Sequence, residues 1–205
     1  AFLLNRSSDL YGNDWQGEAR KTIDRVRRFN LDTVIVNAEA EYKDPAKATY
    51  ARKYMETVIG GLPNVSIGLS SYRYPTKHPE FPWASFLPYI DFHAPQVYWA
   101  WANNPVSQLD QSIAEIRALE RKLGIGEKPI VPIGAAYHEE GWQPEPVELD
   151  LFDARVRELK LPGIYWWEWG HAQRYGFRDV IASHHWRAAP PPIGAVLWAR
   201  VTTAK

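Results

Sequence analysis

Residues Thr33 to Tyr42 read TVIVNAEAEY, and this stretch decides the fold that we expect. It opens with a continuous apolar run rich in β-branched residues, which is typical of a strand buried on both faces of a parallel sheet. Because side chains alternate along a strand, Asn37, Glu39 and Glu41 are expected to share one face. Placing carboxylates at the end of a buried strand costs free energy, so a functional role would explain their presence there. We predict that Glu39 and Glu41 perform acid–base chemistry; the alternatives are that they are solvated or bind Arg73 structurally.

Length and composition narrow the class of protein. The chain has 205 residues, enough for one domain with a substantial core, and we expect residues 1–205 to form that single domain. Its 24 basic residues balance 24 acidic ones, which argues against a nucleic-acid binder or a partner of acidic membranes. No apolar run is long enough to span a bilayer. Cysteine is absent, which excludes disulfides and thiolate zinc sites and suits a protein that is secreted or associated with a cell wall.

Aromatic residues are unusually frequent, with 10 Trp and 11 Tyr. Their rings offer an apolar, weakly negative face that matches the C–H face of a sugar. This composition favours contact with carbohydrate. The alternative is that the rings fill a core or an interface.

Predicted strands and helices alternate along the chain. Strands are expected at residues 2–5, 33–42, 65–72, 90–99, 130–137, 163–169 and 193–201, and helices at 15–29, 45–59, 106–123, 145–159 and 173–185. Repeats of this kind indicate βα units with a parallel sheet, which right-handed crossovers either close into a barrel or leave doubly wound.

Polar and aromatic residues gather after several of these strands, and no Gly-rich phosphate loop follows any of them. Sites assembled from many strand ends are what a (β/α)8 barrel provides, so we predict an α/β fold of this TIM-like type. The seven expected strands are one fewer than such a barrel has. The barrel would therefore be compact, lack a regular first unit at its N-terminus, or be closed unusually by residues 193–201, which follow a Pro-rich connector at 190–192.

The acidic stretch resembles a motif of glycan-cleaving barrels. Asn37-x-Glu39-x-Glu41 has the spacing of the Asp-x-Asp-x-Glu strand end of family 18 chitinases, and Glu39-x-Glu41 that of the Asp-x-Glu strand end of family 25 lysozymes. Neither match is literal, because Asn and Glu stand where Asp is expected. The likeness covers roughly residues 32–172 at the level of strand order and a few residues.

The resemblance implies a retaining hydrolase of an N-acetylated polysaccharide, peptidoglycan- or chitin-like, that needs no metal or cofactor. Glu41 would be the general acid. Glu39 would stay ionised and orient the 2-acetamido group of the substrate, whose carbonyl oxygen is the nucleophile, or would stabilise the oxocarbenium-like transition state. A Tyr near the reacting sugar is matched by Tyr98, and a Trp beneath that sugar by Trp167 or Trp169.

Other polar and aromatic residues at strand ends are candidates for binding the substrate. They are Asn37, Arg73, Tyr74, Gln96, Tyr98, Tyr137, Trp167 and Trp169. Gln96 shares a strand face with Tyr98, and inward projection would bring both near the carboxylates. A structural ion pair remains the alternative for Arg73, and a buried hydrogen-bonded role for Tyr98. Trp99 and Trp101 either line the rim of a cleft or cover a helix.

Two other functions remain open. A metal-dependent hydrolase would use His138 and His171 with the nearby Glu139, Glu140 or Glu168, although none of their spacings is a known ligand motif. A barrel that binds glycan without cleaving it would explain the departures from the Asp-containing motifs.

Overall fold

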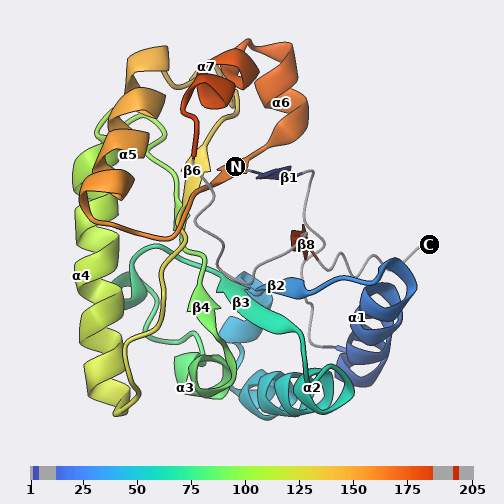
Figure 1. Cartoon of the computed structure of the whole chain (residues 1–205). Helices are drawn as coiled ribbons and strands as arrows, with labels where there is room; N and C mark the ends of the chain where they lie inside the picture. Colours follow the sequence, from blue (N-terminus) through green and yellow to red (C-terminus); the bar gives the residue numbers. More distant parts are fainter. Residues whose placement is uncertain (1, 5–12, 187–195, 199–205) are drawn as a thin grey trace.

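The computed structural model describes residues 2–4, 13–186 and 196–198, and strands alternate with helices along them, as predicted (Figure 1). The strands are β1 Phe2–Leu4, β2 Thr33–Asn37, β3 Ser66–Ser70, β4 Phe92–His93, β5 Gln96–Val97, β6 Ile133–Ala135, β7 Tyr165–Trp167 and β8 Val196–Trp198. The α-helices are α1 Trp15–Phe29, α2 Ala48–Gly61, α3 Trp83–Phe86, α4 Pro105–Leu123, α5 Pro146–Glu158, α6 Trp169–Arg174 and α7 Phe177–Ser183. Four short 3-10 helices are η1 Ala40–Lys43, η2 Pro45–Lys47, η3 Pro75–Lys77 and η4 Leu87–Tyr89.

All strand pairings are parallel, in the orders β1-β7-β6-β5 and β4-β3-β2-β8. Strands β4 and β5 are two halves of the strand expected at residues 90–99. They are separated at Pro95, which has no N–H to donate, although its carbonyl still accepts from the N–H of Ile133 at 2.9 Å. Single bridges from Tyr72 to Gln96 and from His93 to Ile130 join the two sheets there.

The edge strands decide how far the barrel prediction holds. β1 pairs with β7 and β8 with β2, and no pairing within the described ranges joins β1 to β8. The prediction is therefore confirmed as an α/β fold built on parallel strands, while a closed (β/α)8 barrel is not shown. Of the predicted closing strand at 193–201, residues 196–198 form β8; the connector at 190–192 lies outside the described residues.

Side chains of the strands pack alternately inward and outward. Val34 and Val36 belong to the cluster under α1 and α2, whereas Ile35 packs in an inner cluster with Phe92 and Tyr165. The helices lie outside the strands in Figure 1, with α4 and α5 side by side. Odd-numbered positions of β2 therefore face inward, which directs Asn37 into the interior.

The stretch that decides the fold leaves the sheet sooner than expected. β2 ends at Asn37, and Glu41 lies in η1, so the prediction that Glu41 continues the strand face of Asn37 and Glu39 is wrong. The cause is Tyr42, whose fully buried ring packs edge-on against Phe86 with centroids 5.1 Å apart. To bury that ring the chain turns, and the N–H of Tyr42 bonds to the carbonyl of Glu39 at 3.0 Å.

Two boundaries near the C-terminus also differ from the prediction. β7 ends at Trp167, and Trp169 instead begins α6 with 38% of its surface exposed. The helix expected at 173–185 is divided into α6 and α7 by Gly176, whose φ of +79° favours glycine.

A buried charged network ties β4 to α4. His93 Nε2 lies 2.9 Å from Glu120 Oε1, and Arg117 Nη1 donates to Glu120 Oε2 at 2.6 Å. The backbone N–H of Lys128 donates to Glu120 Oε1 at 2.9 Å. The Glu120 carboxylate itself is fully buried and all of these groups bond to it, which gives the network a structural role.

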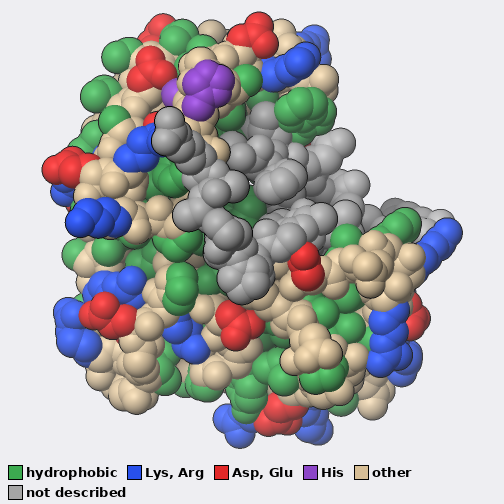
Figure 2. Space-filling model, viewed as in Figure 1, with side chains coloured by type: hydrophobic (Ala, Val, Ile, Leu, Met, Phe, Trp, Pro, Cys, Tyr) green, Lys and Arg blue, Asp and Glu red, His purple; other side chains and the backbone are tan. Residues whose placement is uncertain are grey.

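Acidic and basic side chains are interspersed over the face seen in Figure 2, in keeping with the zero net charge. No helix in the described part of the chain is both long and apolar enough to cross a bilayer.

Candidate active site

The carboxylate of Glu39 is held at the carboxyl ends of the strands by two amides. Its Oε1 accepts from Asn37 Nδ2 at 3.0 Å and from Gln96 Nε2 at 2.8 Å. Gln96 Nε2 also lies 3.0 Å from Asn37 Oδ1. The structure thus brings together three of the predicted site residues, from the end of β2 and from β5.

Ser70 belongs to the same group and was missed from the sequence. It ends β3 in register with Asn37, and its hydroxyl lies 3.3 Å from Gln96 Nε2. The signal that could have found it is strand register, because equivalent positions of neighbouring parallel strands face the same side.

Tyrosine rings border this group. Tyr98 and Tyr137 pack edge-to-face with centroids 5.5 Å apart. Burial raises the pKa of Tyr98 well above its usual value, and the charges of Tyr137 and Glu39 raise it further, while Arg73 acts in the opposite direction. Burial also raises the pKa of Tyr137 to about 12. Both phenols therefore stay protonated at neutral pH, and Tyr98, whose pKa the charge of Glu39 raises, is a hydrogen-bond donor near that carboxylate.

Glu41 lies on a separate turn, beside Tyr72. Burial raises the pKa of Tyr72, Lys43 opposes this, and the charges of Glu39 and Glu41 add to it. Lys43 Nζ lies 4.8 Å from the centre of the Tyr72 ring and forms an ion pair with Glu80 at 2.7 Å. Glu41 is therefore near Glu39 without sharing the amide network that holds it.

Arg73 and Tyr74 turn towards α4. Arg73 Nε donates to Gln108 Oε1 at 2.9 Å, and the hydroxyl of the buried Tyr74 donates to the same oxygen. Within residues 13–186, Arg73 forms no ion pair with Glu39 or Glu41. Tyr74 is thus a contact with the helix, whereas the charge of Arg73 still reaches Tyr98 and Tyr137.

The Trp167 face of β7 points inward, as predicted. Tyr165 lies in the inner cluster, and Trp167 packs against it, whereas Trp166 packs outward on Phe152 of α5 at 5.6 Å between centroids. A cis peptide bond joins Trp167 to Glu168. Trp169, in contrast, is separated from this face because α6 begins there.

The residues of the metal hypothesis also meet in part. The buried Glu168 accepts from the N–H of His171 at 3.0 Å, and the N–H of His138 donates to His171 Nδ1 at 3.0 Å. Among the residues that the structure describes, no group of three or more His, Cys, Asp or Glu side chains is arranged to hold a metal ion.

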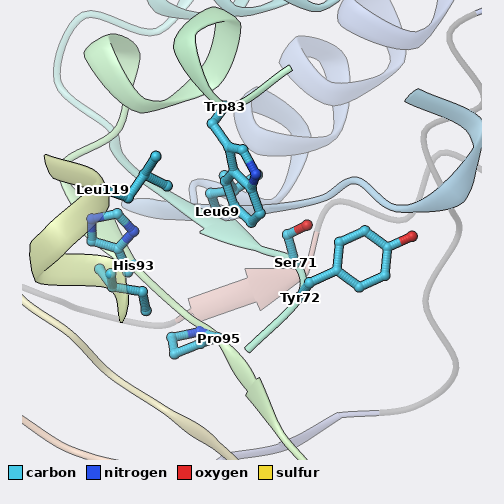
Figure 3. Close-up of a pocket in the computed structure, with 8 residues that line it drawn as sticks. Leu69, Ser71, Tyr72, Trp83, His93, Pro95 and Leu119 are labelled. Atoms are coloured by element: carbon cyan, nitrogen blue, oxygen red, sulfur yellow. The ribbon is translucent and has the colours of Figure 1, made fainter. Parts of the chain in front are cut away.

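A small pocket lies between strands β3 and β4 and helix α4. It is lined by Leu69, Ser71, Tyr72, Trp83, His93, Pro95, Ile116 and Leu119. Figure 3 shows His93 and Leu119 close together there, with the hydroxyl of Tyr72 pointing away from them. The pocket is thus on the α4 side of β3 and β4, and Glu39 does not line it.

Comparison with known proteins gives a match at the level of fold. No protein-family model and no curated protein sequence matches the chain. Bee venom hyaluronidase, solved in complex with a hyaluronic acid tetramer, has a TM-score of 0.51 and 14% identity over 85% of this chain and 65% of its own. The β-D-glucuronidase of Dictyoglomus thermophilum has a TM-score of 0.54 and 13% identity over 75% of this chain and 28% of its own.

These identities and coverages limit the similarity to the fold. The chain spans about two thirds of the hyaluronidase and less than a third of the glucuronidase. Its fold is similar to that of barrel glycosidases, and membership of families 25 or 18 is not confirmed.

Proposed function

We propose that this chain is a glycoside hydrolase that cleaves an N-acetylated polysaccharide. The observation that carries the proposal is the carboxylate of Glu39 at the strand ends, with Oε1 held by Asn37 and Gln96. Glu39 is half-buried, and we assign its other oxygen, Oε2, to the contact with a substrate oxygen. Barrel enzymes assemble their sites at this end of the strands. The similarity to a hyaluronidase that binds a hyaluronic acid tetramer supports a polymeric, N-acetylated substrate.

The geometry favours Glu39 over Glu41 as the general acid, because Asn37 and Gln96 hold the Glu39 carboxylate, whereas Glu41 lies in η1 outside these hydrogen bonds. Protonated on Oε2, Glu39 gives its proton to the leaving glycosidic oxygen. The acetamido carbonyl oxygen of the substrate bonds to the anomeric carbon as the glycosidic bond breaks. Water then attacks that carbon, the bond to the acetamido oxygen breaks, and Glu39 takes the proton of the water. The neutral hydroxyl of Tyr98 is a donor for the acetamido group in this scheme.

A glycan-binding barrel without catalysis is the second candidate, and Asn37 favours it. Asn37 is a neutral amide where the resembling motifs carry Asp, so one carboxylate serves the group instead of two. A missing negative charge would weaken electrostatic stabilisation of the cationic transition state. If the protein binds glycan without turnover, we expect Asn37→Asp to create measurable cleavage; a variant that binds and remains inactive would show that Asn37 is not the cause.

The proposed function is tested by incubating the protein with chitin oligomers, peptidoglycan and hyaluronan, with and without a chelator, and measuring new reducing ends. We expect reducing ends from at least one of these glycans at a rate that the chelator does not change. Binding without turnover would support the second candidate, and loss of activity with chelator would support a metal hydrolase. A protein that neither binds nor cleaves any of the three contradicts the proposal.

A further inference from the structure

Four aromatic rings form a continuous row that leads away from Glu39. Tyr98 contacts Tyr137 at 5.5 Å between centroids, Tyr137 contacts Trp142 at 5.6 Å, and Trp142 contacts Trp101 at 6.3 Å. The rings come from the segments that follow β5 and β6. We call these four residues the aromatic row.

The row passes from the interior to the surface. Tyr137 is 9% exposed and Trp142 7%, whereas Trp101 is 59% exposed. Keeping a large indole in water forgoes the hydrophobic stabilisation that its burial would give. An exposed ring next to the buried Tyr137 and Trp142 therefore calls for an explanation other than packing.

Hydrogen bonds tie the turn that carries the exposed Trp101. Trp101 has a φ of +58° and Asn103 a φ of +49°, and a positive φ is uncommon for a bulky residue. Trp142 Nε1 donates to Asn103 Oδ1 at 2.9 Å, and the N–H of Asn103 bonds to the carbonyl of Trp99 at 3.2 Å. Trp99 itself is fully buried against Phe152 of α5, so of the two rim candidates it is the one that covers a helix.

We propose that the exposed ring of Trp101, supported by the buried Trp142 behind it, forms a distal glycan-binding subsite on which a sugar several units from the cleaved bond stacks. The inference rests on the proposed function, because it takes the polysaccharide to run from Glu39 along the aromatic row. A sugar suits the surface, since a single exposed ring beside polar groups matches one pyranose face and its hydroxyls. The exposed Asn103, Asn104 and Gln143 supply those polar groups.

The test compares Trp101→Ala with Phe29→Ala. Phe29 is a matched control, because it is an aromatic residue with 57% exposure at the end of α1, just before β2 begins and thus at the opposite end of the strands. Hexamers and dimers of chitin and of hyaluronan are titrated into each protein by calorimetry. We expect Trp101→Ala to bind at least one hexamer about tenfold more weakly, with dimer binding unchanged. Phe29→Ala should bind like the unaltered protein.

A third variant separates loss of the ring from damage to the turn. Trp101→Tyr keeps an aromatic face at the same backbone position and should recover most of the hexamer affinity. Equal hexamer affinities of the Trp101→Ala and Phe29→Ala variants would overturn the subsite. The subsite would also be overturned if the protein cleaved short glycans but bound neither hexamer. That outcome would leave the proposed function intact. Hexamer binding that depends on Trp101 without any new reducing ends would support the subsite and count against catalysis.

Discussion

Replacing Glu39 by Gln is expected to lower kcat for glycan cleavage by at least about 100-fold, while glycan binding is retained. The Gln side chain has the same shape, and its carbonyl oxygen can still accept from Asn37 and Gln96, which now hold Oε1 at 3.0 and 2.8 Å. What the amide lacks is a proton to give to the leaving oxygen. The measurement is the rate of new reducing ends at saturating glycan, together with calorimetric titration of a chitin or hyaluronan hexamer.

Glu41→Gln is the matched control for this experiment. Glu41 is two residues away and carries the same charge, but it lies in η1 outside the amide network. We expect its substitution to leave kcat nearly unchanged. Loss of activity in Glu41→Gln with activity retained in Glu39→Gln would reverse the assignment and restore the one that the family resemblance implies.

The inward face of the site could be predicted from the sequence as far as strand periodicity extends. Alternation placed Asn37 and Glu39 on one side, and the two side chains are hydrogen-bonded at 3.0 Å. It also directed Trp167 inward, where Trp167 packs against the inner cluster. The prediction failed for Glu41 because burial of Tyr42 against Phe86, a contact between residues 44 positions apart in sequence, turns the chain. Local pattern carries no information about such a contact.

The prediction also failed for Trp169, which does not share the strand face of Trp167 because helix α6 begins at Trp169. The aromatic run YWWEW has the composition of a strand throughout, yet Glu168 caps the N-terminus of α6 by accepting from the N–H of His171 at 3.0 Å. Cap residues are usually Ser, Thr, Asp or Asn, so Glu168 gave no clear signal for a helix start. The aromatic row was likewise hidden, because its rings come from two segments that only the fold brings together.

Replacing Glu120 by Ala is expected to lower the free energy of unfolding by about 3–5 kcal/mol. The side chain is fully buried, and its removal takes away the acceptor of His93 and of the N–H of Lys128 and one of the acceptors of Arg117. Urea unfolding followed by circular dichroism measures the change. Asp110 on the same helix is the control, because its ion pair with Arg155 at 2.8 Å is partly exposed and should be worth about 1 kcal/mol or less.

The same network should make stability depend on pH in the acid range. Burial raises the pKa of Glu120, but hydrogen bonds from His93, Arg117 and the N–H of Lys128 outweigh burial and lower it from 4.5 to about 2. The unfolded chain therefore takes up the proton first as the pH falls. The stabilisation is fully present above about pH 4.5 and is lost progressively towards pH 2, amounting to roughly 3 kcal/mol.

Glu120→Gln removes this titration, so its stability should fall less steeply than that of the unaltered protein between pH 4.5 and pH 2. Parallel stability curves for the two proteins over that range would contradict the role of Glu120. The result bears on the candidate site, because α4 also carries Gln108, which holds Arg73 at 2.9 Å. If the network fixes α4 against β4, weakening it should make Arg73 more mobile. The charge of Arg73 acts on Tyr98 and Tyr137, so this pair should be affected as well, without any change at Glu39 itself.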